Sequence, residues 1–208
     1  MRLRDISISL SATTPEWPGD TPFSCGWTAT ISNGSSVNLS SVTSSPHVGT
    51  HADAPLHVRD GWAGAHELPL DAFYGPAIVV DVTTSSGEIG FEMIEPHIQG
   101  QALERLILKT GSTIASGTFP DEWPTLSESC ARRLLGFGLR LLGVDAPSVD
   151  SKDSKSLAVH KMLFSGNAFI LENLDLRRTP AGAYDIIAFP IKMMSVDAAP
   201  VRAILVEK

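Results

Sequence analysis

The residues best suited to chemistry in this sequence are the histidines and the aspartate of one short segment. Residues 47–57 read His-Val-Gly-Thr-His-Ala-Asp-Ala-Pro-Leu-His, so three of the six histidines of the chain lie here beside Asp53. Imidazole and carboxylate together form a ligand set that zinc, manganese or iron accepts. A metal held in this way activates water at neutral pH, so the segment predicts a metal site that hydrolyses an amide-type bond.

The spacing of the segment predicts how these side chains are presented. Its histidines and its aspartate all occupy odd-numbered positions: His47, His51, Asp53 and His57. Alternate side chains of an extended chain point to one face, so that face would carry all four, and the other face would be small or apolar. In a straight strand His47 and His51 would lie about 13 Å apart, too far for one ion. We therefore expect a bend, for which Pro46 and Gly49 are the suitable positions.

Clustering, rather than any single histidine, favours the metal site. A lone histidine on a strand is more often a core or surface residue than a ligand. Thiolate ligands are not expected, because Cys25 and Cys130 lie far apart without Cys-x-x-Cys spacing and are expected to be ordinary reduced thiols. His66 and His97 lie among acidic and turn residues, and we expect both at the surface.

Three residues outside the segment are further candidates. His160 lies in an apolar helical stretch, where a histidine taken alone is more often packed in the core. Glu172 follows Phe169-Ile170-Leu171, and a carboxylate at the end of a buried strand is seldom stable unless it is paired or metal-bound. Trp17 lies in a turn-rich loop and either caps the core or stacks on an aromatic ring. The other tryptophans, Trp27, Trp62 and Trp123, have no comparable claim.

The elements that position these residues follow from short β-branched runs bounded by Gly, Pro or Asp. Strands are expected at Leu3–Leu10, Ala77–Val82, Arg105–Lys109, Leu139–Val144, Ala168–Leu171, Ile186–Ile191 and Val201–Val206, and residues 32–45 fit an exposed strand or hairpin. Helices are expected over Gly90–Ile98, over Leu126–Leu135 with Ser127 as N-cap, and from Asp153 or Ser154 through Leu163 with Gly166 at its end. A strand-rich first part followed by alternation predicts a mixed α/β fold.

Composition limits the class of protein. Hydrophobic residues make up 43% of the chain and charged residues 19%, which is typical of a folded protein, and the length predicts one domain over residues 1–208. The net charge of -7 argues against a nucleic-acid partner. No apolar run approaches the roughly 20 residues that span a bilayer, and Met1–Asp5 lacks the apolar core of a signal peptide. We therefore expect no membrane partner and a cytoplasmic location.

The motif His47-x-Gly49-Thr50-His51-x-Asp53-x-Pro55-x-His57 closely resembles the signature of the metal-dependent cyclase-like hydrolase family. The likeness covers nearly the whole chain and is closest to the bacterial arylformamidase branch. Besides the motif, it rests on Trp17-Pro18-Gly19-Asp20, Asp150-x-x-Asp153-Ser154 leading to His160, Ile170-Leu171-Glu172-Asn173-Leu174, Pro190-x-Lys192 and Asp197-x-x-Pro200-Val201-Arg202-Ala203. The central motif is highly specific for the family, and the flanking segments point to the branch less strongly.

The resemblance implies a site for two divalent metal ions, usually zinc. One ion would be held by His47, His51 and Asp53, and the other by Asp53, His160 and Glu172, with Asp53 and Glu172 shared by both ions. His57 would be the acid/base residue rather than a ligand, and Trp17 would stack on the ring of an aromatic substrate. The resemblance also implies a single-domain α/β fold of the swivelling β/β/α type, with a mixed β-sheet core and flanking helices, and a homodimer.

The reaction that the resemblance implies is hydrolysis of N-formyl-L-kynurenine, a small molecule, to L-kynurenine and formate. Two alternatives stay open: an amide or cyclic-imide hydrolase of the same family, and a metal-binding protein without catalytic activity. A serine hydrolase is disfavoured, because Phe164-Ser165-Gly166 lacks the first glycine of a Gly-x-Ser-x-Gly elbow. Metal identity stays open as well, since these ligands also suit manganese or iron.

Overall fold

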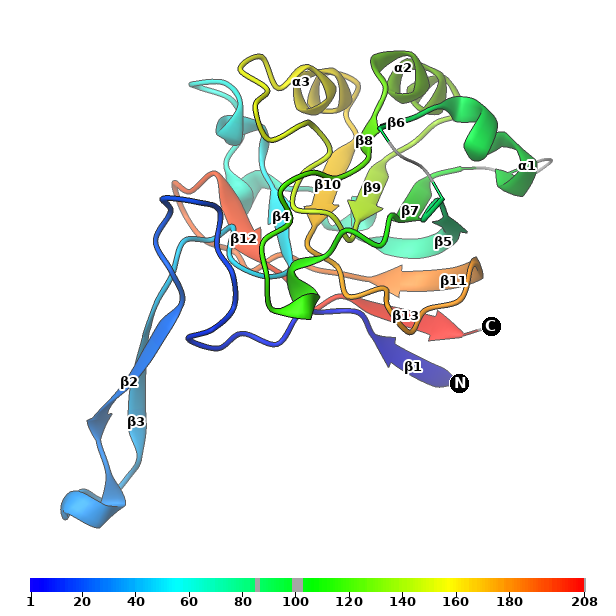
Figure 1. The fold of residues 1–208 in the computed structure, drawn as a ribbon. Helices are drawn as coiled ribbons and strands as arrows, with labels where there is room; N and C mark the ends of the chain where they lie inside the picture. Colours follow the sequence, from blue (N-terminus) through cyan, green and yellow to red (C-terminus); the bar gives the residue numbers. More distant parts are fainter. Residues whose placement is uncertain (85–86, 99–102, 208) are drawn as a thin grey trace.

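A curled, mixed sheet of nine strands forms the centre of the computed structural model, which describes residues 1–84, 87–98 and 103–207 (Figure 1). The strand order is β1-β13-β11-β5-β7-β9-β10-β4-β12. The pairs β5–β7, β7–β9 and β9–β10 are parallel, and the pairs on either side of them are antiparallel. The prediction of an α/β fold with a mixed sheet is therefore confirmed.

The strands of this sheet are β1 (Arg2–Asp5), β4 (His51–Asp53), β5 (Tyr74–Asp81), β7 (Arg105–Lys109), β9 (Leu141–Val144), β10 (Phe169–Glu172), β11 (Gly182–Ile187), β12 (Ala198–Pro200) and β13 (Ile204–Glu207). Two small sheets pair β2 (Ser24–Ala29) with β3 (Leu39–Thr43), and β6 (Glu88–Ile89) with β8 (Thr125–Leu126). The α-helices are α1 (Glu95–Ile98), α2 (Glu128–Gly136) and α3 (Ala158–Ser165). Short 3-10 turns lie at Ile31–Asn33, Pro55–His57, Ala65–Glu67, Leu70–Ala72, Phe91–Met93 and Ile114–Ser116.

Helices α2 and α3 lie side by side over the part of the sheet formed by β9 and β10 (Figure 1). Helix α2 begins as the sequence predicts, because the Ser127 hydroxyl accepts the backbone N–H of Cys130 at 3.1 Å. Cys130 and Leu134 then face the core and are fully buried. Every residue of β9 and of β10 is buried as well, so the strand that ends at Glu172 is enclosed by the core.

The strand predictions are most accurate in the buried parallel part. The predicted strand Arg105–Lys109 is found with these bounds, whereas Leu3–Leu10 forms a strand only as far as Asp5. The segment predicted as Ile186–Ile191 is wrong by half, because the strand is Gly182–Ile187 and the chain leaves the sheet before Pro190. Beyond the strand, Pro190 forms an isolated antiparallel bridge with Val201.

Strands β2 and β3 form a hairpin that projects away from the body of the molecule (Figure 1). The polar run of residues 32–45 contributes the tip of this hairpin and β3, as the sequence predicts. Cys25 lies opposite Val42, and Trp27 lies opposite Ser40. The face that contains Trp27 and Val42 has no cover, since these side chains are 67% and 60% exposed.

Candidate metal centre and active site

Strand β4 brings two polar side chains into the interior from the edge of the core. His51 and Asp53 point to one face and Ala52 to the other, and all three are buried. The neighbouring strand β10 places Glu172 directly opposite His51 in the antiparallel ladder. Residues opposite each other in such a ladder share a face, so the register alone brings a second carboxylate to the histidine of the motif.

The predicted bend lies between His47 and β4. Gly49 has a φ of +72°, which favours glycine, and a Cβ at this position would overlap the side chain of Leu10. The Gly49 carbonyl oxygen lies 2.9 Å from His51 Nδ1. As a result His47 folds back over β4, and its Nδ1 atom lies 3.2 Å from His51 Nε2. The sequence correctly predicted the shared face of His51 and Asp53 and the need for a bend. The expectation of one extended face for all four side chains is wrong, because only His51–Asp53 forms a strand and His57 lies in the 3-10 turn Pro55–His57.

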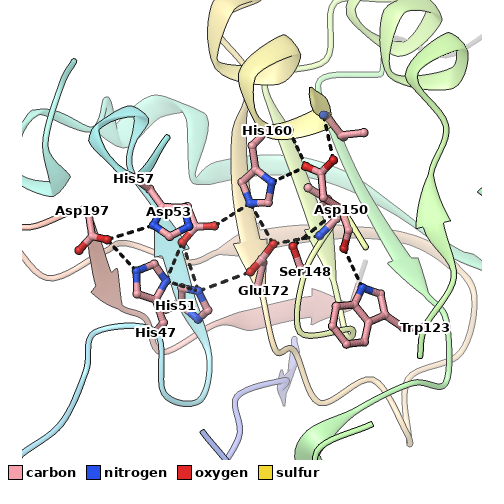
Figure 2. A network of polar contacts seen from close by, with 12 residues as sticks. His47, His51, Asp53, His57, Trp123, Ser148, Asp150, His160, Glu172 and Asp197 are labelled. Carbon is pink, nitrogen blue, oxygen red and sulfur yellow. Dashed lines mark hydrogen bonds and ion pairs between the residues drawn. The ribbon is translucent and has the colours of Figure 1, made fainter. Parts of the chain in front are cut away.

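Two groups of ligand-type atoms meet at Asp53, as Figure 2 shows. Asp53 Oδ1 lies 3.1 Å from His47 Nδ1 and 3.2 Å from His51 Nε2. Asp53 Oδ2 lies 3.3 Å from His160 Nε2, which is itself 3.4 Å from Glu172 Oε1. Glu172 Oε2 lies 3.7 Å from His51 Nε2. Both predicted ligand groups are therefore assembled, joined through the two oxygens of Asp53.

Each imidazole of these groups has one nitrogen that faces a hydrogen-bond acceptor outside the ligand groups. His47 Nε2 lies 3.0 Å from Asp197 Oδ2, and His160 Nδ1 lies 2.7 Å from Asp150 Oδ2. His51 Nδ1 faces the Gly49 carbonyl, as described above. Metal-binding histidines almost always donate their second nitrogen to such an acceptor, which fixes the ring and directs the other nitrogen to the ion. The three rings therefore have the arrangement that a metal site requires.

The chemistry of Asp53 also fits a cation. Its Oδ1 atom is buried and has no hydrogen-bond partner among the described residues, although two imidazole nitrogens lie close to it. A buried carboxylate oxygen without a partner is costly. A divalent cation between Oδ1 and the two nitrogens would satisfy all three atoms, so the donor set present here fits a metal ion.

The electrostatics of the group point the same way. Burial would lower the pKa of His47, but hydrogen bonds to Asp197 and Asp53 outweigh it and raise the pKa to about 10. Burial likewise opposes the upward shift of the His160 pKa, which hydrogen bonds to Asp150, Asp53 and Glu172 produce. Burial raises the pKa of Asp53, yet the neighbouring imidazoles hold it well below its usual range. The carboxylates thus strongly favour positive charge in this interior.

His160 is positioned by the start of helix α3. The predicted N-cap, Asp153 or Ser154, is wrong, because α3 begins at Ala158. The N–H groups of its first turn are instead accepted by the side chain of Asp150. The Asp150 carboxylate accepts the backbone N–H groups of Val159 and His160 at 3.2 and 3.1 Å as well as facing the His160 ring. One buried carboxylate therefore fixes both the helix terminus and the ring of His160.

His57 stands beside both ligand groups without belonging to either. It ends the 3-10 turn Pro55–His57, and its ring centroid lies 4.5 Å from that of His47 and 5.9 Å from that of His160. His57 Nδ1 lies 3.0 Å from Asp197 Oδ2, the same oxygen that faces His47. His57 also lines the cavity described below, so its second nitrogen is the one available to a bound molecule.

A cavity of about 370 Å³ opens above the ligand groups, and His57, Glu172 and Trp17 are among its lining residues. Trp17 is 36% exposed and packs edge-on against Phe119 and Trp123, with ring centroids 5.5 and 5.8 Å away. The lining of the cavity therefore combines the ligand-type side chains with the aromatic rings of Trp17 and Phe119.

Sequence reasoning assigned no role to three residues that belong to this site. Asp197 and Asp150 stood in segments that carry the family resemblance, but only the structure brings them to His47 and His160. Trp123 was set aside, yet its indole N–H donates to the Asp150 carbonyl at 3.0 Å (Figure 2). Its ring also packs edge-on against Trp17. Of the two histidines predicted at the surface, His97 is exposed and His66 is half-buried.

Comparisons with known proteins identify the relatives of the chain. The model of a family described as "Putative cyclase" matches residues 4–151. The chain is 43% identical to a kynurenine formamidase of Salinibacter ruber, over 99% of this chain and 97% of the relative. It is 40% identical to a kynurenine formamidase of Bacillus mycoides, over 97% of this chain and 95% of the relative.

Solved structures share the fold. A potential metal-dependent hydrolase with cyclase activity superposes with a TM-score of 0.83 at 27% identity, covering 98% of this chain and 96% of that chain. Isatin hydrolase A of Labrenzia aggregata has the same fold, with a TM-score of 0.83 at 21% identity over 100% of this chain and 94% of that chain. The chain therefore belongs to the cyclase family of metal-dependent hydrolases, and within it to the group of the bacterial kynurenine formamidases.

Proposed function

We propose that this protein hydrolyses N-formyl-L-kynurenine to L-kynurenine and formate, a step in the degradation of tryptophan by the kynurenine pathway. The full-length similarity to curated kynurenine formamidases supports this substrate. The observation that carries the proposal is the pair of ligand groups joined through Asp53, with His57 beside them in the lining of a cavity that also contains Trp17 and Phe119.

The proposed cofactors are two divalent metal ions, with zinc as the expected metal. His47, His51 and Asp53 would hold one ion, and Asp53, His160 and Glu172 the other. Mixed imidazole and carboxylate ligands suit zinc. When bound, the ions would supply Lewis-acid activation of a water molecule and of the formyl carbonyl group.

His57 is the proposed proton carrier. Its Nδ1 atom is held by Asp197, so the ring is fixed and Nε2 remains the nitrogen that can exchange a proton with a bound molecule. In the reaction, water adds to the formyl carbon and the bond between that carbon and the aryl nitrogen breaks. His57 takes a proton from the water and delivers it to the departing nitrogen, and formate leaves.

Trp17 is the proposed contact for the aryl ring of the substrate. Trp17 is 36% exposed and lines the cavity, and edge contacts with Phe119 and Trp123 hold its indole there. A fixed indole offers a flat face on which an aromatic ring can stack at little entropic cost.

A homodimer is the proposed assembly, and the β2–β3 hairpin supports it. A two-stranded hairpin alone is marginally stable in water, yet every residue of β3 and nearly every residue of β2 is exposed. The apolar face of Trp27 and Val42 has the character of a surface that another protein covers. A second copy of this chain is the partner that we propose.

The experiment that tests the function measures formate release from N-formyl-L-kynurenine by the metal-loaded enzyme, with and without a chelator. We expect turnover that the chelator abolishes and that added zinc restores. His57→Ala should keep its metal and lose about 10²–10⁴-fold in kcat. Isatin serves as the cyclic alternative, and faster hydrolysis of isatin than of the formylated substrate would overturn the assignment.

A further inference from the structure

The cavity contains two charged side chains that the proposed chemistry does not use. Lys152 is the only lysine or arginine among the described residues that line it, and Asp20 is the only acidic lining residue besides Glu172. In a protein with a net charge of -7, a single cation inside the substrate cavity is a specific feature. Its position suggests that it meets a negative charge on the substrate.

Lys152 belongs to the loop that supports the metal centre. It lies two residues after Asp150, whose carboxylate holds His160, so the two Cα atoms lie no more than about 7 Å apart. The ammonium group lies 5.7 Å from the ring centroid of Phe119, on the aromatic wall. Its nearest carboxylate is that of Asp121, 3.7 Å away and fully exposed, and such surface pairs contribute little. Lys152 is therefore close in the chain to Asp150, and its only ion pair among the described residues is a weak one with Asp121.

Asp20 is held on the same turn as Trp17. The Asp20 N–H donates to the Trp17 carbonyl at 2.9 Å, and Gly19 has a φ of +90°, as a tight turn after Pro18 requires. Asp20 Oδ1 accepts the backbone N–H of Thr21 at 2.7 Å. The proposed stacking ring and a carboxylate thus reach the cavity from one rigid turn, while Lys152 reaches it from another loop.

We infer that Lys152 and Asp20 form a recognition site for the amino-acid end of the substrate, with Lys152 binding its α-carboxylate and Asp20 facing its α-ammonium group. The inference rests on the proposed formamidase function. In N-formyl-L-kynurenine the formamide and the chain that ends in the zwitterion are ortho substituents of one ring. With the ring stacked on Trp17 and the formamide at the ligand groups, that chain leaves the ring beside the formamide, so its charged end lies within the same cavity, which Lys152 and Asp20 line.

The test compares three substrates that share the reacting group. N-formyl-L-kynurenine carries both charges, 4-(2-formamidophenyl)-4-oxobutanoate carries only the carboxylate, and 2-formamidoacetophenone carries neither. Lys152→Met removes the charge and keeps an apolar stem against Phe119. Asp20→Asn keeps the acceptor for the Thr21 N–H. Lys155→Met is the matched control, because Lys155 is exposed on the same loop and does not line the cavity.

We expect Lys152→Met to raise KM about tenfold to a hundredfold for the two carboxylates, as the loss of a charge-assisted contact predicts, and to leave 2-formamidoacetophenone unchanged. Asp20→Asn should raise KM for N-formyl-L-kynurenine alone. Equal losses on all three substrates, or no change on any, would overturn the inference. A wild-type enzyme that hydrolyses 2-formamidoacetophenone with the same KM as N-formyl-L-kynurenine would also overturn it while leaving the formamidase function intact. If none of the three formamides is hydrolysed, the proposed function itself fails.

Discussion

Asp197 Oδ2 lies 3.0 Å from His57 Nδ1 and thereby fixes the ring of the proposed proton carrier. The same oxygen lies 3.0 Å from His47 Nε2, so one carboxylate positions a proposed ligand and the proposed acid/base residue together. Both imidazoles lower the pKa of this carboxyl group, which keeps it ionised at every pH at which the enzyme would work. Asp197 therefore links the proposed metal ligand His47 to the proposed proton carrier His57.

Replacement of Asp197 should slow the reaction without unfolding the protein. Loss of an outer partner of a metal ligand typically costs about 10- to 100-fold in activity or metal affinity. We expect Asp197→Ala to show this loss and Asp197→Asn, which keeps one acceptor oxygen, to retain more activity. The measurements are kcat and metal content, with Asp60→Asn as the control because Asp60 is exposed. An Asp197→Ala enzyme with normal kcat and normal metal content would contradict the positioning role.

Replacement of Glu172 should remove one metal ion of the proposed pair. Glu172 faces both His160 and His51, and it also accepts the Val149 N–H at 3.0 Å. Glu172→Gln keeps that last bond and removes the charge, so we expect a fall from two ions to one per chain and at least about a hundredfold loss of kcat. Elemental analysis gives the count. Two ions and full activity in this variant would rule out Glu172 as a shared ligand, and Glu122→Gln at an exposed position is the control.

Metal binding should strengthen as pH rises. Ligand imidazoles must lose their protons when a metal binds, and the pKa of His47 is raised to about 10. Calorimetry in buffers of different ionisation enthalpy should therefore detect proton release at pH 8. Metal affinity that does not change between pH 6 and 8 would contradict this prediction.

The stability of the chelated protein should have the opposite pH dependence. A folded-state pKa of about 10 for His47, against an ordinary value of 6.5, contributes stability that is fully present below about pH 6.5 and is lost as pH rises through about 10. We expect thermal melts of the chelated protein to shift downward across this window. The zinc-loaded protein, whose ligands are already deprotonated, should show a smaller shift.

The β2–β3 hairpin should be required for formation of the proposed homodimer. Trp27 and Val42 share its exposed apolar face, and a variant with Trp27→Ser and Val42→Thr should be a monomer of 22.2 kDa by light scattering where the parent is twice that mass. Ser41→Ala, on the other face of the hairpin, is the control. A monomeric parent protein, or an unchanged mass in the double variant, would contradict the proposed homodimer.

Gly143 should be required for the packing of β9 against the side chains of Ile107 and Leu174. A Cβ on Gly143 would lie 2.5 Å from Ile107 Cδ1 and 2.9 Å from Leu174 Cδ1, so Gly143→Ala should cost about 1–3 kcal/mol in the free energy of unfolding. Gly136, in helix α2, has nothing within 4 Å of a Cβ, and Gly136→Ala should be neutral or stabilising. Denaturant unfolding of both variants makes the comparison, and equal stabilities would contradict it.

The sequence predicted the parts of the site that depend on local pattern. The odd-numbered positions predicted the shared face of His51 and Asp53, and the glycine predicted the bend at Gly49. Glu172 could be singled out because a carboxylate ending the run Phe169–Glu172 needs a partner. These inferences succeeded because alternation, backbone freedom and the cost of burial act within a few residues.

Long-range contacts account for what the sequence did not predict. Asp150 replaces Asp153 or Ser154 at the start of α3 because the loop folds back, which residue type does not indicate. Asp197 reaches His47 across 150 positions of sequence, and no periodicity records such a contact. His160, typical of a packed histidine when read alone, is directed to Asp53 only by the fold and was identified through the family resemblance.

The position of β4 in the sheet has a consequence for folding during synthesis on the ribosome. Its two neighbours, β10 and β12, begin at Phe169 and Ala198, and the contact between Asp53 and His160 spans 107 positions of sequence. A ribosome adds about 5–20 residues per second, so the nascent chain carries His51 and Asp53 without their sheet partners for several seconds. Catalytic competence should therefore arise abruptly and late, when the final third of the chain emerges and encloses the first.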